Sequence, residues 1–243
     1  MPNGRLPQAP PGLRLYAVGD IHGRLDLLQE MDRLIAADAR SAKGATGIIM
    51  LGDYIDRGPD SAGVIQHLID AKARDGRVTL RGNHEVYVLE LLDDPSVLAR
   101  WRRYGGVEAL ASWGIDLSTL SPAEIEVEAP AIAKSFLASL PPAHRRFFEA
   151  TALSYRAGDY FFAHAGIRPG VPLDAQHDID LLTIREPFHS SLDDHGVVVV
   201  HGHTPGPAPV LRSNRIGIDT KAYDSGRLTC LVLEGTEQRF LVT

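Results

Sequence analysis

The 243-residue chain has a single cysteine, no long hydrophobic run and no excess of basic residues. Because it stands alone, Cys230 excludes an intrachain disulfide, and within the apolar run LTCLVL it is expected to be a small buried side chain. No stretch approaches the roughly 18 apolar residues of a membrane span, and none resembles a signal peptide. The net charge of -6 argues against a dedicated nucleic-acid binder, which would normally carry a basic face. These absences predict a cytoplasmic protein whose partners include neither a nucleic acid nor a membrane.

What is present is an ordinary apolar content of 44%, enough for one substantial core. Three short apolar runs that end in glycine begin at Leu13, Thr46 and Arg77, and they alternate with two segments of helical periodicity, RLDLLQEMDRLIAADAR and SAGVIQHLIDAKA. This alternation predicts an α/β fold with a parallel sheet and right-handed crossovers. Residues 1–13, rich in proline and glycine, are expected to be a flexible leader to a domain at 14–243.

The second half of the chain changes character twice. From Val86 to about Ala150 it is helical and poor in strands, which predicts a helical insertion or cap at 86–150. Five strand-like runs follow: YFFAHAG, VVVVHGH, NRIGIDT, RLTCLVLEG and RFLVT. Their close spacing is typical of an antiparallel meander, and we expect them to build a second sheet against the first.

Polar side chains follow the first three expected strands directly. Asp20, Asp53 and Asn83 should therefore line up along the carboxyl edge of one sheet, where open α/β folds bind ligands. In the stretch RGNHEVY, Asn83 is also a good helix cap and Glu85 suits a first helical turn. This stretch alone does not separate a helix start from a functional site.

Five motifs stand at the ends of expected strands, in the order GDIHG, GDYIDRG, RGNHE, HAG and HGHT. Their carboxylate, amide and imidazole groups suit divalent Mn, Fe, Zn, Co or Ni, whereas a structural zinc site would be expected to use cysteine. Six convergent ligands are too many for one catalytic metal with an open position and favour two metals. Two carboxylates would leave such a centre electropositive, so we expect an anionic substrate, bound with the help of Arg57, Arg81 and Arg185.

Together the five motifs resemble the signature of the phosphoprotein phosphatase family, the metal-dependent Ser/Thr phosphatases within the calcineurin-like metallophosphoesterases, and its bacterial and phage members in particular. The resemblance covers nearly the whole chain after the leader. It implies the calcineurin-like metallophosphoesterase fold, an α/β fold with two mixed β-sheets packed between helical layers. It also implies two divalent metal ions, of which Mn is the first expectation and Fe, Zn, Co or Ni are alternatives.

The resemblance further implies a role for each motif residue. The implied metal ligands are Asp20 and His22 for the first metal, Asp53 as a bridge, and Asn83, His164 and His203 for the second. His84 is the implied general acid, oriented by Asp56, and the implied phosphate-binding residues are Arg57, Arg81 and Arg185. A hydroxide that bridges the metals would attack phosphorus in line, without a covalent enzyme intermediate, and His84 would protonate the leaving oxygen.

Three functions are compatible with these motifs. The first is hydrolysis of phosphomonoesters on Ser/Thr phosphoproteins or peptides, with phosphotyrosine as a further possible substrate. The second is hydrolysis of diadenosine polyphosphates, small phosphorylated molecules handled by enzymes with similar motifs. The third is a noncatalytic metal-binding module. Selectivity is expected to depend on the insertion at 86–150.

Several residues outside the motifs also carry expectations. His201 is expected to pack at a strand end, and Glu85 to lie behind the ligands or at a helix start. The stretch RWRRY, Arg100 to Tyr104, is interpreted as a solvated helix face or a cap wall, and Lys221 is hypothesised to border the site and to favour anionic substrates. The histidines expected on the surface are His67, His144, His177, His189 and His195.

Overall fold

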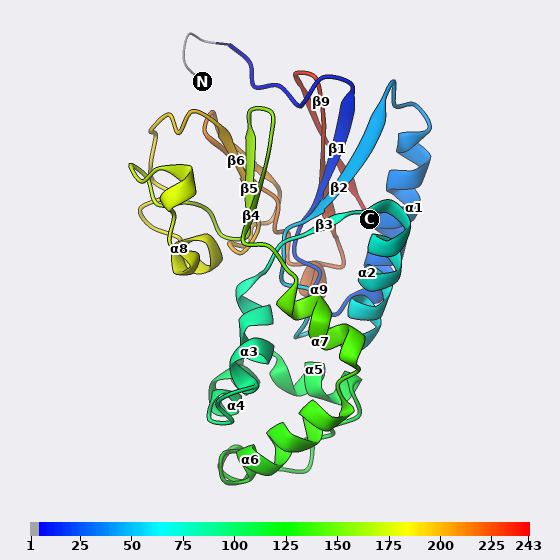
Figure 1. The fold of residues 1–243 in the computed structure, drawn as a ribbon, viewed down its shortest axis with the longest axis vertical. Helices are drawn as coiled ribbons and strands as arrows, with labels where there is room; N and C mark the ends of the chain where they lie inside the picture. The colour runs from blue at the N-terminus through cyan, green and yellow to red at the C-terminus, as the bar shows by residue number, and fades with distance from the viewer. Residues whose placement is uncertain (1–4) are drawn as a thin grey trace.

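The computed structural model describes residues 5–243, and two five-stranded sheets form its upper part in Figure 1. The first sheet has the order β10-β9-β1-β2-β3. Its strands are β1 (Leu13–Val18), β2 (Ala45–Met50), β3 (Val78–Thr79), β9 (Thr229–Glu234) and β10 (Glu237–Val242). β1, β2 and β3 are parallel neighbours, which confirms the alternation of strands and helices expected for the first part of the chain.

Helices α1 (Leu25–Ala39) and α2 (Ser61–Asp75) connect these parallel strands and cover one face of the first sheet. α1 buries Leu28, Met31 and Ile35, which share one helical face. α2 begins after Asp60, whose carboxylate accepts the N–H of Gly63, and it ends at a glycine in the left-handed conformation. Local signals therefore place both crossovers.

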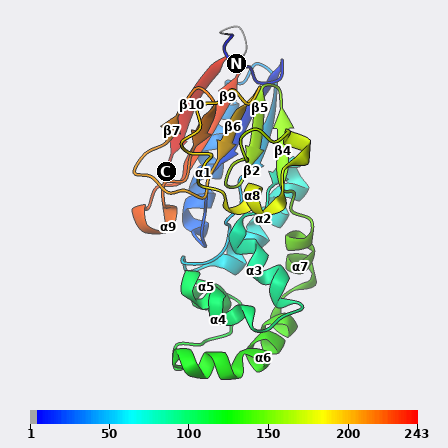
Figure 2. The same cartoon turned by 90° about the vertical axis from the view of Figure 1, so that its left-hand side faces the viewer.

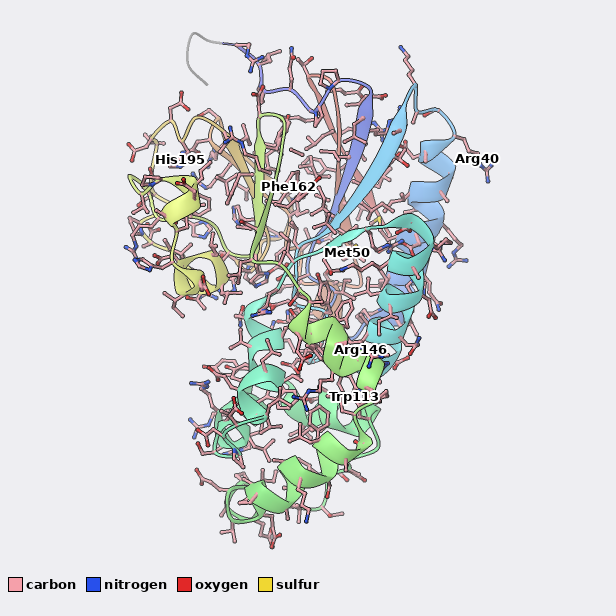
Figure 3. All side chains as sticks on the ribbon, viewed as in Figure 1. Arg40, Met50, Trp113, Arg146, Phe162 and His195 are labelled. Carbon is pink, nitrogen blue, oxygen red and sulfur yellow. The ribbon has the colours of Figure 1, made fainter. Side chains whose placement is uncertain are left out.

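The second sheet has the order β4-β5-β6-β8-β7 and packs against the first. Its strands are β4 (Ser154–Ala157), β5 (Tyr160–Ala163), β6 (Val198–His201), β7 (Val210–Leu211) and β8 (Arg215–Gly217). The core between the sheets includes Leu15, Leu233, Phe162 and Val200, and Figure 3 shows Phe162 in the region between them. The short helices η3 (Leu173–Ala175) and α8 (Asp178–Thr183) lie over the outer face of this sheet.

Two expectations for the last strands are wrong. β9 and β10 join the first sheet, where β9 pairs with β1 and buries both of its faces. Cys230 and Val232 pack toward the helices, while Leu231 and Leu233 pack toward the second sheet. Nor do β5, β6 and β8 form an antiparallel meander, since they pair in parallel. Cys230 itself is fully buried and free, as expected.

A lobe of helices lies below the two sheets in both views (Figures 1 and 2). Its helices are α3 (Asn83–Leu91), α4 (Val97–Trp101), η2 (Arg102–Tyr104), α5 (Gly106–Ser112), α6 (Pro122–Ser139) and α7 (Pro142–Glu149). Aromatic side chains form its core, with the Phe136 ring 5.8 Å from Trp101 and 5.6 Å from Trp113. The residues expected to be a helical cap are thus helical, although the first helix begins at Asn83. Among the helices of residues 5–243, none combines the length and apolar character that a membrane crossing requires.

The expected flexible leader at 1–13 is attached to the domain wherever the structure describes it. Residues 1–4 of that leader lie outside the described part of the chain. The backbone N–H of Ala9 donates to the carbonyl of Gly235 at 2.8 Å, and the N–H of Gln8 donates to the Asp159 carboxylate at 2.8 Å. Leu13 is already part of β1.

Candidate metal centre

The five motifs meet where the sheets border the helical lobe. Asp20 follows β1, Asp53 follows β2 and Asn83 opens α3 after β3, so the expected alignment along one sheet edge is confirmed. His164 directly follows β5, and His203 lies two residues beyond the end of β6. Because β5 and β6 run parallel, their carboxyl ends share an edge and bring the two histidines together, with ring centroids 5.2 Å apart.

Asp53 is the shared member of the site. Its Oδ2 atom lies 3.6 Å from His22 Nε2 and 3.8 Å from His84 Nε2, while its Oδ1 atom lies 3.3 Å from His164 Nε2. Two groups of possible ligand atoms, each within 4.8 Å of one another, therefore contain Asp53: one with His22 and His84, the other with His164 and His203. A carboxylate between two ligand groups has the geometry of a bridge between two cations.

Asn83 and Asp20 complete the cluster. Asn83 Oδ1 lies 3.1 Å from His164 Nε2 and 2.8 Å from His203 Nδ1. Asp20 Oδ2 accepts the backbone N–H of His203 at 3.0 Å, but the buried Oδ1 has no hydrogen-bond partner among residues 5–243. A buried carboxylate oxygen without a donor is costly unless a cation pairs with it. These donors therefore fit divalent cations.

The imidazoles are oriented for metal binding. Nδ1 of His22 lies 2.9 Å from the carbonyl of Ile55, and Nδ1 of His164 lies 2.9 Å from that of Leu51. A ring N–H held by a carbonyl leaves Nε2 with its lone pair toward the centre. Burial lowers the pKa of His22 and of His203 to about 3, so both rings are neutral. Burial also lowers the pKa of His164, but the Asp53, Asp20 and Glu85 carboxylates together outweigh burial and raise it to about 10, and a metal ion would replace that proton.

The backbone is strained at the same place. His22, Asp53 and His203 have φ values of 48°, 51° and 62°, and Asp56 and Arg57 have values of 77° and 66°. Residues other than glycine rarely adopt this left-handed region, and such strain clusters at functional sites.

Glu85 binds the backbone around the strained residue Asp53. Its carboxylate accepts the backbone N–H groups of Asp53, Tyr54 and Gly82, each at 2.8 Å. Burial raises the pKa of this carboxyl to about 7. The expectation that Glu85 lies behind the ligands or at a helix start is confirmed in both respects, since it lies in the first turn of α3.

We expect Glu85→Ala to lower the free energy of unfolding by about 3 kcal/mol or more. Three buried N–H groups would lose their acceptor, and each orphaned donor costs about 1–3 kcal/mol. Urea unfolding measures the change. Glu85→Gln keeps one acceptor oxygen and should lose less. An alanine variant as stable as the native chain would contradict the role assigned to this carboxylate.

His84 and Asp56 form a buried pair beside the cluster. His84 Nδ1 lies 2.5 Å from Asp56 Oδ2, and Trp101 Nε1 donates to both Asp56 oxygens at 2.8 and 2.9 Å. His84 Nε2 lies 3.4 Å from Nη2 of Arg57. Burial lowers the pKa of His84, but the neighbouring Asp53 and Asp56 carboxylates outweigh burial and raise it. The pair can therefore hold a proton at the edge of the metal cluster.

Trp101 corrects the interpretation of RWRRY as a solvated face. Its side chain is fully buried, because its indole is both a donor to Asp56 and part of the aromatic core of the lobe. Tyr104, 48% exposed, lines the cavity over the site. The stretch is thus a wall of the helical cap, the other interpretation of its sequence.

A cavity of about 330 Å³ opens over the cluster. Besides candidate ligands it is lined by Arg57 and Arg185 and by three tyrosines, Tyr87, Tyr104 and Tyr223. Neither arginine forms an ion pair within the described residues, so both guanidinium groups can bind an anion.

Arg81 does not reach this cavity. Its Nε donates to Thr151 Oγ1 at 2.9 Å, and its Nη2 contacts the carbonyls of Phe148, Glu149 and Thr151 at 3.3–3.4 Å. The last carbonyls of a helix lack intrahelical partners and attract cations, so the end of α7 binds this guanidinium. The expectation that Arg81 binds substrate has no support in this geometry.

The sequence interpretation missed several residues that line the cavity. Asp219 and Tyr223 lie two residues before and after Lys221 in the sequence, and both line the cavity. The side chain of Lys221 is exposed and is absent from the lining, and its N–H donates to Asp219 Oδ1 at 2.9 Å. The effect of Lys221 on anionic substrates stays a prediction. The position of Tyr87, one helical turn after His84, was the signal that could have revealed a further cavity residue.

The remaining histidines are mostly more buried than expected. His201 packs at its strand end as expected, with its ring 5.2 Å from Phe188. His144 is buried, because its Nδ1 accepts the buried indole N–H of Trp113 at 3.1 Å, so its expected surface position is wrong. His67, His189 and His195 are half-buried, and His177 is exposed.

The comparisons with known proteins agree with this architecture. A family model described as calcineurin-like phosphoesterase matches residues 13–230. Shewanella-like protein phosphatase 2 of Arabidopsis thaliana is 33% identical over 85 residues, which are 32% of this chain and 22% of that protein. The symmetrical bis(5'-nucleosyl)-tetraphosphatase of Legionella pneumophila (strain Lens) is 35% identical over 77 residues, 32% of this chain and 26% of that protein. The matches thus span about a quarter of these relatives' lengths.

A similar fold is found in a crystal structure of a proposed diadenosine tetraphosphatase. The TM-score is 0.65 at 21% sequence identity, with 100% of this chain and 96% of the other covered. The expected fold, two mixed β-sheets packed between helical layers, is confirmed.

Proposed function

Because the chain belongs to the calcineurin-like phosphoesterase family, we propose that it is a metal-dependent phosphohydrolase that removes phosphate from phosphoserine and phosphothreonine in proteins or peptides. The observation that carries this proposal is the position of the His84–Asp56 pair. It lies between the candidate metal cluster and a guanidinium group that has no carboxylate partner within residues 5–243. A proton donor, an anion-binding group and a set of metal ligands within one cavity suit hydrolysis of a phosphate ester.

Two divalent cations are part of this proposal. Asp20, His22 and Asp53 would hold one, and the other would be held by Asp53, Asn83, His164 and His203. When bound, they would supply a water of lowered pKa as nucleophile and neutralise the charge of the phosphoryl group. Mn is the proposed ion, with Fe, Zn, Co or Ni as alternatives.

The chain's own residues would do the rest. Arg57 and Arg185 would bind phosphate oxygens from the cavity wall, which both of them line. His84 would donate the Nε2 proton to the leaving oxygen. Asp56 would keep the ring in place through Nδ1, and Trp101 would keep Asp56 in place.

A second hollow next to the cavity supports a peptide as substrate. It has a volume of about 260 Å³, shares Asn83 and Tyr87 with the cavity, and is lined on its apolar side by Val86, Ile179 and Leu182. An extended phosphopeptide could place its phosphate over the metal cluster and a neighbouring side chain in this hollow.

Hydrolysis of a dinucleoside tetraphosphate is the second candidate. The observation in its favour is the set of three tyrosines around the cavity, whose rings offer faces on which an adenine could stack. The two arginines would then bind a polyphosphate chain instead of a single phosphate. A noncatalytic metal-binding module is the third candidate, and it would have no use for the His84–Asp56 pair.

A comparison of rates separates these candidates. The Mn-loaded protein would be assayed on a phosphoserine/phosphothreonine peptide, a phosphotyrosine peptide and diadenosine tetraphosphate, with His84→Asn as the blank. We expect kcat/KM to be at least about tenfold higher for the Ser/Thr peptide, a difference of about 1.4 kcal/mol. A higher value for the dinucleotide would move the function to nucleotide hydrolysis. Metal binding without any turnover would favour the noncatalytic module.

A further inference from the structure

Tyr223 lies outside all five motifs, yet its ring contacts two residues of the site. It belongs to the short helix α9 (Ala222–Ser225) and lines the cavity. The guanidinium carbon of Arg57 lies 4.6 Å from the centre of the Tyr223 ring. The His22 ring lies 5.3 Å away at an interplanar angle of 88°. One aromatic side chain thus touches both a candidate metal ligand and a candidate phosphate-binding group.

The Arg57 guanidinium has little other support. Within residues 5–243 it makes no ion pair, its Nη2 atom lies 3.4 Å from His84 Nε2, and the Asp219 carboxylate in the same cavity attracts its charge from a longer distance. Its backbone is held, because φ is 66° and the N–H donates to the carbonyl of Gly105 at 3.3 Å. A carboxylate could also hold the guanidinium, but it would occupy the N–H donors that an anion needs. An aromatic face attracts the cation and leaves those donors free.

Tyr223 is itself firmly placed. The preceding residue, Ala222, is buried, and its carbonyl accepts Nη1 of Arg24 at 3.1 Å. Arg24 is held in turn by Asp26 at 2.7 Å. These contacts join the start of α9 to the start of α1 and support the position of the ring beside the arginine.

We propose that Tyr223 is a positioning residue that holds the Arg57 guanidinium in its phosphate-binding orientation, as the 4.6 Å stacking contact in the cavity wall indicates. The inference rests on the proposed function, since it assumes that Arg57 binds the phosphate group of the substrate. The ring acts on anion binding and leaves proton donation to His84. It should therefore affect KM and the affinity for inorganic phosphate, and not the pH profile of kcat.

The test is a double-mutant cycle between Tyr223 and Arg57. Tyr223→Leu and Tyr223→Met are compared in the native chain and in Arg57→Ala, all Mn-loaded and checked for equal metal content. We expect each Tyr223 variant to raise KM and the dissociation constant of inorganic phosphate by roughly 3- to 30-fold, the range of a partly buried cation–π contact. Tyr223→Phe keeps the ring and should restore most of the affinity. In Arg57→Ala, loss of the ring should have no further effect.

Calorimetry with inorganic phosphate keeps this inference separate from the proposed function. If the native chain hydrolyses none of the substrates but binds phosphate, and loss of the ring weakens that binding, the positioning role stands and the function fails. Equal losses in the native and Arg57→Ala backgrounds would overturn the positioning role. So would a fall in kcat at unchanged KM and unchanged phosphate affinity. Two replacements of different shape, leucine and methionine, guard against one variant that fails to fold.

Discussion

Replacing His84 by asparagine should lower turnover by about 10²- to 10⁴-fold while the protein keeps its metal ions. In the structure His84 Nδ1 is held by Asp56 at 2.5 Å, and Nε2 lies beside Arg57 at the cavity. Asparagine fills part of the same space but cannot protonate a leaving oxygen. The loss should therefore fall on kcat, with a smaller effect on KM.

Metal content decides between two roles for His84. Its Nε2 atom lies 3.8 Å from Asp53 Oδ2 and belongs to a possible ligand group with His22, so it has the geometry of a ligand as well as of an acid. Elemental analysis of His84→Asn, with His177→Asn as an exposed control, measures the bound ions. Loss of metal in parallel with activity would make His84 a ligand and would contradict the general-acid role.

Asp53→Asn should have a larger effect than His84→Asn, because this one substitution disturbs both groups of metal ligands and so lowers the affinity for both ions. Loss of residues that merely orient metal ligands typically costs 10- to 100-fold in affinity or activity. A carboxylate shared between two sites should therefore cost more than about 100-fold in metal affinity. The amide has nearly the same shape, and the backbone N–H of residue 53 keeps its bond to Glu85. The fold should survive the loss of charge.

Titration of Mn into the metal-free variant measures this effect. We expect the two binding events of the native chain to become one weak event or none. Asp178→Asn removes an exposed carboxylate of α8 and serves as the matched control. Retention of two ions at native affinity would show that Asp53 is no bridge.

Local sequence patterns were enough to predict the place of the candidate site. Asp20, Asp53 and Asn83 each follow a short apolar run that ends near glycine, and parallel strands bring such positions to one edge. The end of a strand and the start of a helix depend on residues that are close in sequence, so both can be predicted from the local sequence. The resemblance of the five motifs to the phosphoprotein phosphatase signature implied the other candidate ligands, and the structure brings His22, His164 and His203 to the same place.

Roles that depend on distant partners could not be predicted in this way. Arg57 and Arg81 both belong to motifs and both carry the same charge. One turns to the cavity and to Tyr223, and the other turns to the carbonyls at the end of α7. Trp101 reaches Asp56 across 45 positions of sequence. Residues that are neighbours in sequence do not indicate which distant group each of these side chains will contact.

The sheet to which β9 and β10 belong was predicted wrongly for the same reason. The run from Thr229 to Glu234 is apolar on both faces, so its sequence is compatible with a place in either sheet. In the structure it pairs with the edge of β1. Periodicity and turn residues report burial and local conformation, which belong to short segments of chain. Pairing between strands that are far apart in sequence, and the direction of a long side chain at a crowded site, depend on the packing of the whole molecule.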